Sequence, residues 1–215
     1  MEKQTKYIPA LGYDWLTPLY DPLLRWGMRE ETFKRRLIAQ AQIAPGYRVL
    51  DLGCGTATLT ILIKQLHPEA IVIGLDGDPQ VLEIGRAKAA RAGVDITLDQ
   101  GMAFQLPYPD TSFDRVLSSL VLHHLTREDK QRTAYEAFRV LRPGGELHVF
   151  DFGKPHTAPA HMLSLVTRRL ERAADNIAGL LPEMFRRAGF EAVEEAARYM
   201  TIVGTLASYK ARKPL

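Results

Sequence analysis

Residues 49–60 read VLDLGCGTATLT, an apolar run that passes into a loop with two glycines. The run is typical of a buried strand, and Gly53 and Gly55 lack the Cβ atoms that keep a ligand away from the backbone. Thr58 begins a helical pattern, so the loop amides would lie at a helix N-terminus, where polar ligands bind. A strand followed by Gly-x-Gly is also a common tight turn, and the loop alone leaves both interpretations open.

A second strand pattern follows at the spacing of a nucleotide-binding fold. Residues 71–76 read IVIGLD, and the run ends in Asp76, 23 residues after Gly53. In doubly wound folds an acid at this place accepts hydrogen bonds from ribose hydroxyls. The alternative role is a helix N-cap, but Asp78, directly before Pro79, is better placed for it. Asp76 is therefore predicted to face a ligand.

Short β-branched runs alternate with helical patterns from Arg48 onward, which predicts an α/β fold with a mostly parallel sheet covered by helices. We expect strands at 48–52, 71–75, 96–98, 115–120 and 146–150. Helices are expected at 58–65, 79–91, 127–140 and 182–188, and the β-leaning runs at about 192–199 and 205–211 are expected to form an antiparallel pair.

Two regions lie outside this alternation. Residues 1–44 are predicted to form a helical N-terminal extension, and about 154–179 a helical insertion within the remaining domain, 45–215. Both would lie at the edge of the sheet where ligands bind, so we expect them to act as a lid over the substrate.

Composition narrows the classes of function. The chain has 215 residues, enough for one domain, and 28 basic against 25 acidic residues give a net charge of +3. This surplus is too small to indicate a nucleic-acid surface. The single cysteine excludes an internal disulfide and a cysteine-rich zinc site, and it fits a reducing cytoplasm. No metal site and no membrane span are predicted, whereas contact with a membrane surface stays open.

Successive segments of the chain resemble motifs of the class I S-adenosylmethionine-dependent methyltransferases, particularly those of ubiquinone and menaquinone biosynthesis. Within residues 48–152 these are VLDLGCGTATLT, VIGLDGDPQVLEIGRAKA, FQLPYPDTSFDRVLSSLVLHHL and AFRVLRPGGELHVFDF, and LPEMFRRAGF at 181–190 resembles the group's last helix and turn. The resemblance implies a Rossmann-like three-layer α/β/α sandwich with an antiparallel C-terminal strand. It also implies methyl transfer from S-adenosylmethionine to a small, partly apolar molecule.

The resemblance further implies where the cofactor binds. The loop 53–55 would face its amino-acid part, Asp76 would bind the ribose diol, and Gly77 would lie beside the adenosine. The backbone carbonyl of Ser118 would face the cofactor's ammonium group. The remaining members of the implied set are Asp51, Cys54, Met102, Ala103 and Tyr20.

Two positions depart from the family pattern. Ala57 stands where many relatives have a third glycine, which is a small change. Met102, which would line the adenine together with Ala103, stands where an acidic residue commonly meets the adenine amino group. The thioether replaces a polar contact by an apolar one, so the cofactor is expected to bind less tightly.

Three residues are candidates for proton transfer. His123 and His124 follow the fourth strand, and Asp151 ends the fifth, so all three would lie near the acceptor. The family often has a histidine here irrespective of substrate, and a structural role is the alternative for each. The reaction itself is a direct displacement, in which a base is needed only when the attacking atom must lose a proton.

Other functions remain as alternatives. A nicotinamide-dependent dehydrogenase would share the loop and Asp76, but the third glycine of its fingerprint would fall at Thr58. A nucleic-acid methyltransferase would share the cofactor domain, although no recognisable nucleic-acid module is present. A non-catalytic cofactor-binding protein is the last alternative, and the intact Gly53, Gly55 and Asp76 disfavour it.

Overall fold

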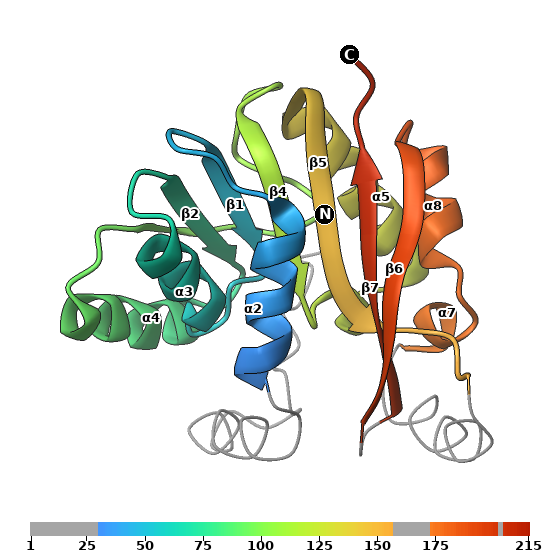
Figure 1. Cartoon of the computed structure of the whole chain (residues 1–215), viewed down its shortest axis with the longest axis horizontal. Helices are drawn as coiled ribbons and strands as arrows, with labels where there is room; N and C mark the ends of the chain where they lie inside the picture. Colours follow the sequence, from blue (N-terminus) through green and yellow to red (C-terminus); the bar gives the residue numbers. More distant parts are fainter. Residues whose placement is uncertain (1–29, 157–172, 202–203) are drawn as a thin grey trace, which may run out of the picture.

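The computed structural model describes residues 30–156, 173–201 and 204–215. In this part of the chain, seven strands form one sheet in the order β3-β2-β1-β4-β5-β7-β6 (Figure 1). The strands are β1 (Arg48–Leu52), β2 (Ile71–Asp76), β3 (Thr97–Gln100), β4 (Phe113–Ser119), β5 (Leu141–Phe152), β6 (Glu191–Thr201) and β7 (Gly204–Arg212). The helices are α2 (Glu30–Ala41), α3 (Thr58–Leu66), α4 (Pro79–Ala92), η2 (Leu122–His124), α5 (Arg127–Val140), α7 (Ala174–Ile177) and α8 (Leu181–Arg187).

Strand directions confirm the predicted sheet. β1 pairs in parallel with β2 and β4, β2 pairs with β3, and β4 pairs with β5. β7 alone among the described strands runs antiparallel, between β5 and β6. The carboxyl ends of β1, β2, β4 and β5 therefore meet at one edge, where such folds bind ligands.

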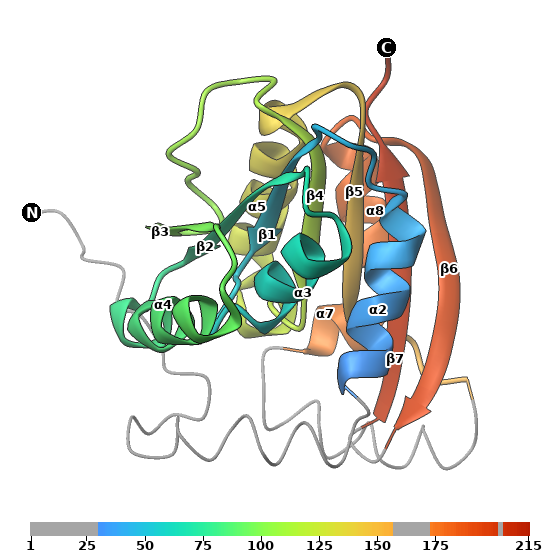
Figure 2. The same cartoon turned by 60° about the vertical axis from the view of Figure 1, so that its left-hand side comes forward.

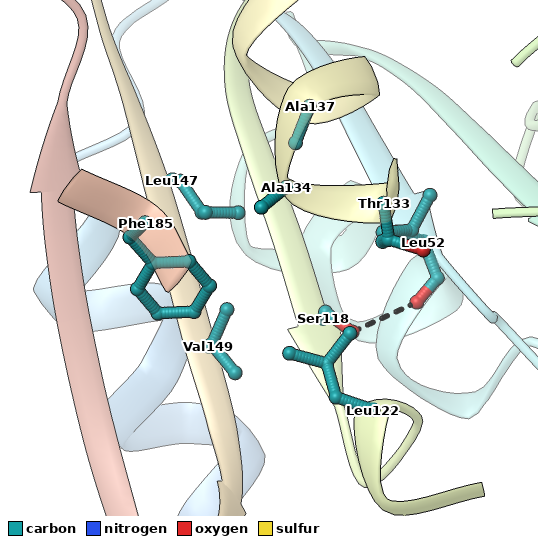
Figure 3. Close-up of a pocket in the computed structure, with 9 residues that line it drawn as sticks. All are labelled: Leu52, Ser118, Leu122, Thr133, Ala134, Ala137, Leu147, Val149 and Phe185. Atoms are coloured by element: carbon teal, nitrogen blue, oxygen red, sulfur yellow. Dashed lines mark hydrogen bonds between the residues drawn. The ribbon is translucent and has the colours of Figure 1, made fainter. Parts of the chain in front are cut away.

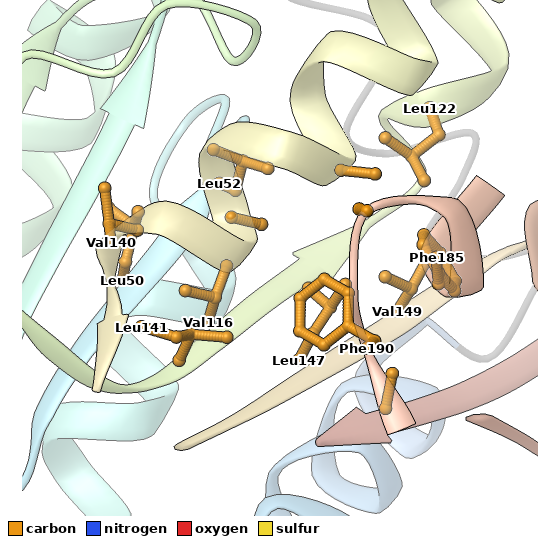
Figure 4. Packing of buried hydrophobic residues seen from close by; sticks show 14 of the residues in the cluster. Leu50, Leu52, Val116, Leu122, Val140, Leu141, Leu147, Val149, Phe185 and Phe190 are labelled. Atoms are coloured by element: carbon orange, nitrogen blue, oxygen red, sulfur yellow. The ribbon is translucent and has the colours of Figure 1, made fainter. Parts of the chain in front are cut away.

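Helices cover both faces of the sheet. Figures 1 and 2 show α2, α3 and α4 on one face and α5 and α8 on the other. Neighbouring strand residues serve opposite faces, as the period of two requires: Val49 packs with the α2 and α3 side, whereas Leu50 packs with the α5 and α8 side. Figure 4 shows the second of these clusters. The arrangement is the predicted three-layer sandwich.

Local signals explain the helix ends near the site. Asp78 caps α4, because its carboxylate accepts a hydrogen bond from the Gln80 amide at 2.8 Å, as predicted. Gly93, with φ of 63°, ends the same helix. Thr126 caps α5 by accepting from the Asp129 amide at 3.1 Å.

Apart from β1, the strands differ from their predicted limits by a few residues, most of all at the start of β5. β3 begins and ends slightly later than predicted, and β5 begins at Leu141 instead of 146. Gly144, after Pro143, has φ of 74° and turns the chain within β5, and its amide donates to the Lys213 carbonyl at 3.0 Å. A shift in register between β4 and β5 absorbs the extra residues.

Only part of the two extra regions is described. In α2, the predicted apolar face is buried, with Leu37, Ile38 and Ala41 at most 2% exposed against the sheet. Residues 1–29 and 157–172, which hold most of the predicted lid, lie outside the described residues. Across the described residues, every helix is too short or too polar to cross a membrane.

Candidate functional site

The loop between β1 and α3 is held against two other strands. The amides of Gly53 and Cys54 donate to the Leu75 carbonyl of β2 at 2.8 and 3.0 Å. Gly53 has φ of 72°, and a Cβ there would lie 2.4 Å from Cγ2 of Val121, which follows β4. Both observations require glycine at position 53. Around Gly55, in contrast, a Cβ would meet no atom within 4 Å.

Asp76 lies at the carboxyl end of β2 and faces this loop. Its Oδ2 accepts from the Gly55 amide at 2.8 Å, and its Oδ1 accepts from the Asp78 amide at 3.0 Å. Burial raises the pKa of Asp76, and the two amide hydrogen bonds oppose the rise. The side chain stays partly exposed. A carboxylate with lone pairs to spare is thus fixed where two hydroxyls of a ligand could bind.

Met102 lies beside Gly77. The sequence predicts that both residues flank the adenosine. A Cβ on Gly77 would lie 3.0 Å from the Met102 sulfur. Met102 and Gln105 form an isolated bridge that turns the chain here, and Ala103 packs against the core from within this turn. The three residues therefore present a small apolar surface next to Asp76, and this combination fits an adenosine.

Asp51 and Cys54 lie beneath the loop, not on its surface. Asp51 is 1% exposed and accepts a hydrogen bond from the Thr60 hydroxyl at 2.6 Å. Burial raises the pKa of Asp51 to about 6, although the hydrogen bond from Thr60 lowers it. Burial also raises the pKa of the Cys54 thiol, and the sulfur packs against Gly74. The thiol is therefore a packing group and not a reactive thiolate.

Ser118 ends the paired part of β4 on the side of β1. The pairing of these strands stops at Asp51 and Leu117. One step further, the Ser118 hydroxyl donates to the Leu52 carbonyl at 3.1 Å. Ser118 thus lies next to the glycine loop, and its side chain is occupied by a main-chain contact.

The three candidates for proton transfer lie together at the ends of β4 and β5. His123 Nδ1 is 2.9 Å from Asp151 Oδ1, and both side chains are buried. The rings of His123 and His124 have centroids 3.9 Å apart. Burial, followed by the neighbouring His123, lowers the pKa of His124 to about 3. His124 is therefore neutral at physiological pH and a weak proton acceptor.

The match to known proteins follows the same elements. A methyltransferase domain model matches residues 49–145. A demethylmenaquinone methyltransferase of Thermus thermophilus is 33% identical over 174 residues, which cover 79% of this chain and 76% of that protein. The chain belongs to the class I S-adenosylmethionine-dependent methyltransferases. Enzymes of this family transfer a methyl group from S-adenosylmethionine. The match therefore confirms the family and the cofactor that the sequence motifs indicated.

Two further relatives mark how far the likeness extends. A demethylmenaquinone methyltransferase of Symbiobacterium thermophilum is 34% identical over 72% of this chain, but the match spans only 62% of that protein's length. The crystal structure of the YcgJ protein from Bacillus subtilis superposes with a TM-score of 0.69 at 19% identity, over 85% of this chain and 98% of that one. At such identity the structural likeness concerns the fold alone.

Two residues of this methyltransferase site were not among the sequence-based candidates. Val121 contacts Gly53, and Asn176 of α7 donates to Asp151 Oδ1 at 3.0 Å. Neither could be found from local patterns, since both roles depend on contacts between distant segments. Tyr20, which was predicted to fold over the cofactor, lies outside the described residues.

An internal gap near Ser118 is separate from this site. It lies between the sheet and helices α5 and α8, and Figure 3 shows its lining side chains, with the Ser118 to Leu52 hydrogen bond at one end. The free space holds about one water molecule. Its walls are almost entirely apolar, and the Thr133 hydroxyl is buried without a partner among the described residues. The gap is a packing defect of the core and too small for a substrate.

Proposed function

We propose that this chain transfers the methyl group of S-adenosylmethionine to a small, partly apolar acceptor by direct displacement. The observation that carries the proposal is the fixed geometry of Asp76 against the Gly53–Gly55 loop, in a chain of this family. Relatives named demethylmenaquinone methyltransferases make a reduced demethylmenaquinone the first acceptor to test.

Most residues of the cofactor set have a part in this proposal. When bound, the cofactor supplies an activated methyl group, and the protein orients it. Asp76 accepts from the ribose hydroxyls, while Gly77, Met102 and Ala103 flank the purine. The backbone of the Gly53–Gly55 loop and the Ser118 carbonyl face the amino-acid end. Asp51 supports the loop from below with a negative charge.

His123 is the better candidate for accepting a proton from the acceptor. An imidazole that donates to a carboxylate is stabilised when it gains a charge, and His123 has such a partner in Asp151. His124 lacks the basicity for this task and instead provides a neutral wall. We also propose that residues 1–29 and 157–172 complete the acceptor pocket, on the grounds of their sequence, and that the enzyme acts in the cytoplasm.

Two measurements test the function. Calorimetry with S-adenosylmethionine, its demethylated product and NAD tests the cofactor, and tight binding of NAD alone would contradict the proposal. Mass spectrometry of reactions with a reduced short-chain demethylmenaquinone, and then with metabolite pools, tests the acceptor. A gain of one methyl group that requires both enzyme and cofactor supports the proposal, whereas methylation of nucleic acid alone would overturn it.

A further inference from the structure

We propose that Asp151 is a positioning residue, whose carboxylate holds the turn after β4 and α7 in place and fixes the proton of His123 on Nδ1. The proposal rests on the proposed function, because it concerns the acceptor side of the same site. It gives Asp151 a different role from the proton acceptor that its place at a strand end suggested.

The carboxylate of Asp151 is buried and receives donors from three segments of the chain. Oδ2 accepts from the amides of Val121 and Leu122 at 3.1 and 2.8 Å. Oδ1 accepts from the Phe152 amide at 2.7 Å, and His123 and Asn176 approach the same atom. The side chain is 0% exposed. With these donors on its two oxygens, the carboxylate has no lone pair left for a proton from the acceptor.

The turn that Asp151 holds is strained. Leu120, which ends the strand region of β4, has φ of 60°, a conformation that costs a residue with a side chain about 1–2 kcal/mol. Its amide donates to the Phe150 carbonyl at 2.8 Å, and the next two amides donate to Asp151. Strain of this kind persists only where surrounding contacts fix it. Asp151 supplies such contacts directly after Leu120.

The same turn lies beside the cofactor loop and also carries the two histidines of the acceptor side. Val121 packs against Gly53 of the cofactor loop, and His123 and His124 lie one and two residues beyond Leu122. On the far side, α7 is tied to α5, because Asp175 pairs with Arg127 and lies 3.5 Å from Lys130. Asn176 then links α7 to Asp151. Movement of one carboxylate would thus loosen the turn and α7 together.

The charge of Asp151 sets the direction of the hydrogen bond to His123. Burial works against ionisation, but three backbone amides donate to the two oxygens of Asp151 and favour its charged form, and with the hydrogen bond of His123 the pKa of Asp151 is lowered. An ionised carboxylate only accepts hydrogen bonds. His123 must therefore donate from Nδ1, and in the neutral ring Nε2 is the acceptor.

The test uses the full chain with ¹⁵N-labelled histidine and compares wild type with Asp151→Asn. An asparagine offers one acceptor and one NH₂ donor, so the donors around position 151 can no longer all be satisfied. We expect wild-type His123 to carry its proton on Nδ1 and the variant to lose this preference. With S-adenosylhomocysteine as probe, the dissociation constant should change less than about threefold, while any turnover of reduced demethylmenaquinone falls at least about tenfold.

Glu146→Gln is the matched control, since it also neutralises a buried carboxylate of β5 but midway along the strand, away from the turn. It should keep the wild-type His123 spectrum. Asn176→Ala covers the case in which Asp151→Asn does not fold, and it should shift the His123 signals without unfolding the chain. A wild-type His123 protonated on Nε2, or a folded Asp151→Asn with unchanged signals, would overturn the proposal. The spectra need no acceptor, so a failure of methyl transfer leaves this result readable on its own.

Discussion

Strand β5 buries two carboxylates, one midway along the strand and one near its carboxyl end, and they have different partners. Midway along the strand, Glu146 meets charged partners: Lys210 at 3.0 Å, Arg212 at 3.4 Å and Arg115 at 3.6 Å, together with His148 at 3.3 Å. Near the carboxyl end, Asp151 meets backbone amides, an amide side chain and an imidazole. The first is a charge network that joins β4, β5 and β7, whereas the second shapes a turn beside the site.

The pKa values of Glu146 and of Asp51 are shifted in opposite directions. The hydrogen bond from His148, opposed by burial and supported by Lys210 and Arg115, lowers the pKa of Glu146 to about 2. Burial raises the pKa of Asp51, a third buried carboxyl, to about 6, although the hydrogen bond from Thr60 and the charge of Lys34 lower it. The ionised form of Glu146 therefore stabilises the fold, whereas ionisation of Asp51 beneath the cofactor loop opposes folding.

The largest effect is expected for Asp76→Ala. Losing charge-assisted hydrogen bonds to the ribose costs about 1.5–3 kcal/mol, which is roughly ten- to a hundredfold in cofactor affinity. Calorimetry with S-adenosylhomocysteine measures the loss, and urea unfolding checks that the variant remains folded. Unchanged affinity in a folded variant would rule out the ribose role.

Glu146→Gln should lower the free energy of unfolding without touching cofactor affinity. The charged partners around position 146 lose an ionised acceptor, which costs about 2 kcal/mol for hydrogen bonds of this kind; the exposed Arg212 reaches water and adds little. Urea unfolding at neutral pH gives the change. A variant as stable as wild type would mean that the network contributes nothing net.

Asp51→Asn should act in the opposite direction. Because the folded chain raises the pKa of Asp51 from 3.8 to about 6, ionisation at neutral pH opposes folding. A neutral side chain of the same shape still accepts from Thr60, so stability at pH 8 should rise by about 1–3 kcal/mol. Cofactor affinity should fall, since the loop loses the charge beneath it. A stability loss would contradict this account.

The pH dependence of unfolding separates the two carboxyls. Glu146 has a folded pKa of about 2 against an ordinary value of 4.5, so its stabilisation is present above pH 4.5 and is lost as the pH falls toward 2. For Asp51 the penalty is full above about pH 6 and fades as the pH falls toward 3.8. Urea unfolding across this pH range gives the free energy of unfolding as a function of pH. Glu146→Gln should flatten this curve between pH 2 and 4.5, and Asp51→Asn should flatten it between pH 3.8 and about 6.

At the carboxyl end of the sheet, sequence patterns predicted the strands and helices but not the contacts between distant side chains. Strands β1 and β2, the Asp78 cap and the place of Asp76 follow from periodicity and spacing, which are local signals. The enclosure of Asp151 does not, because three of its donors are the backbone amides of Val121, Leu122 and Phe152, and backbone groups leave no trace in residue identity. Asn176 becomes a partner only when α7 folds back onto η2.

The smallest effect is expected at Ala57, where many relatives have glycine. Ala57 adopts φ of 59°, so its Cβ imposes a strain of about 1 kcal/mol that glycine would relieve. Against this, Ala57 is 0% exposed, and losing a buried methyl costs about 0.8 kcal/mol. Ala57→Gly should therefore change the free energy of unfolding by less than about 0.5 kcal/mol, because the two effects oppose each other.

Ala89→Gly is the matched control, because Ala89 is also buried but lies inside α4, where strain relief is absent and glycine costs about 1 kcal/mol more. Urea unfolding of both variants isolates the strain at position 57 as the difference between them. A loss at Ala57 as large as that at Ala89 would mean that the left-handed turn costs this chain nothing, and that the glycine of the relatives serves the cofactor and not the backbone.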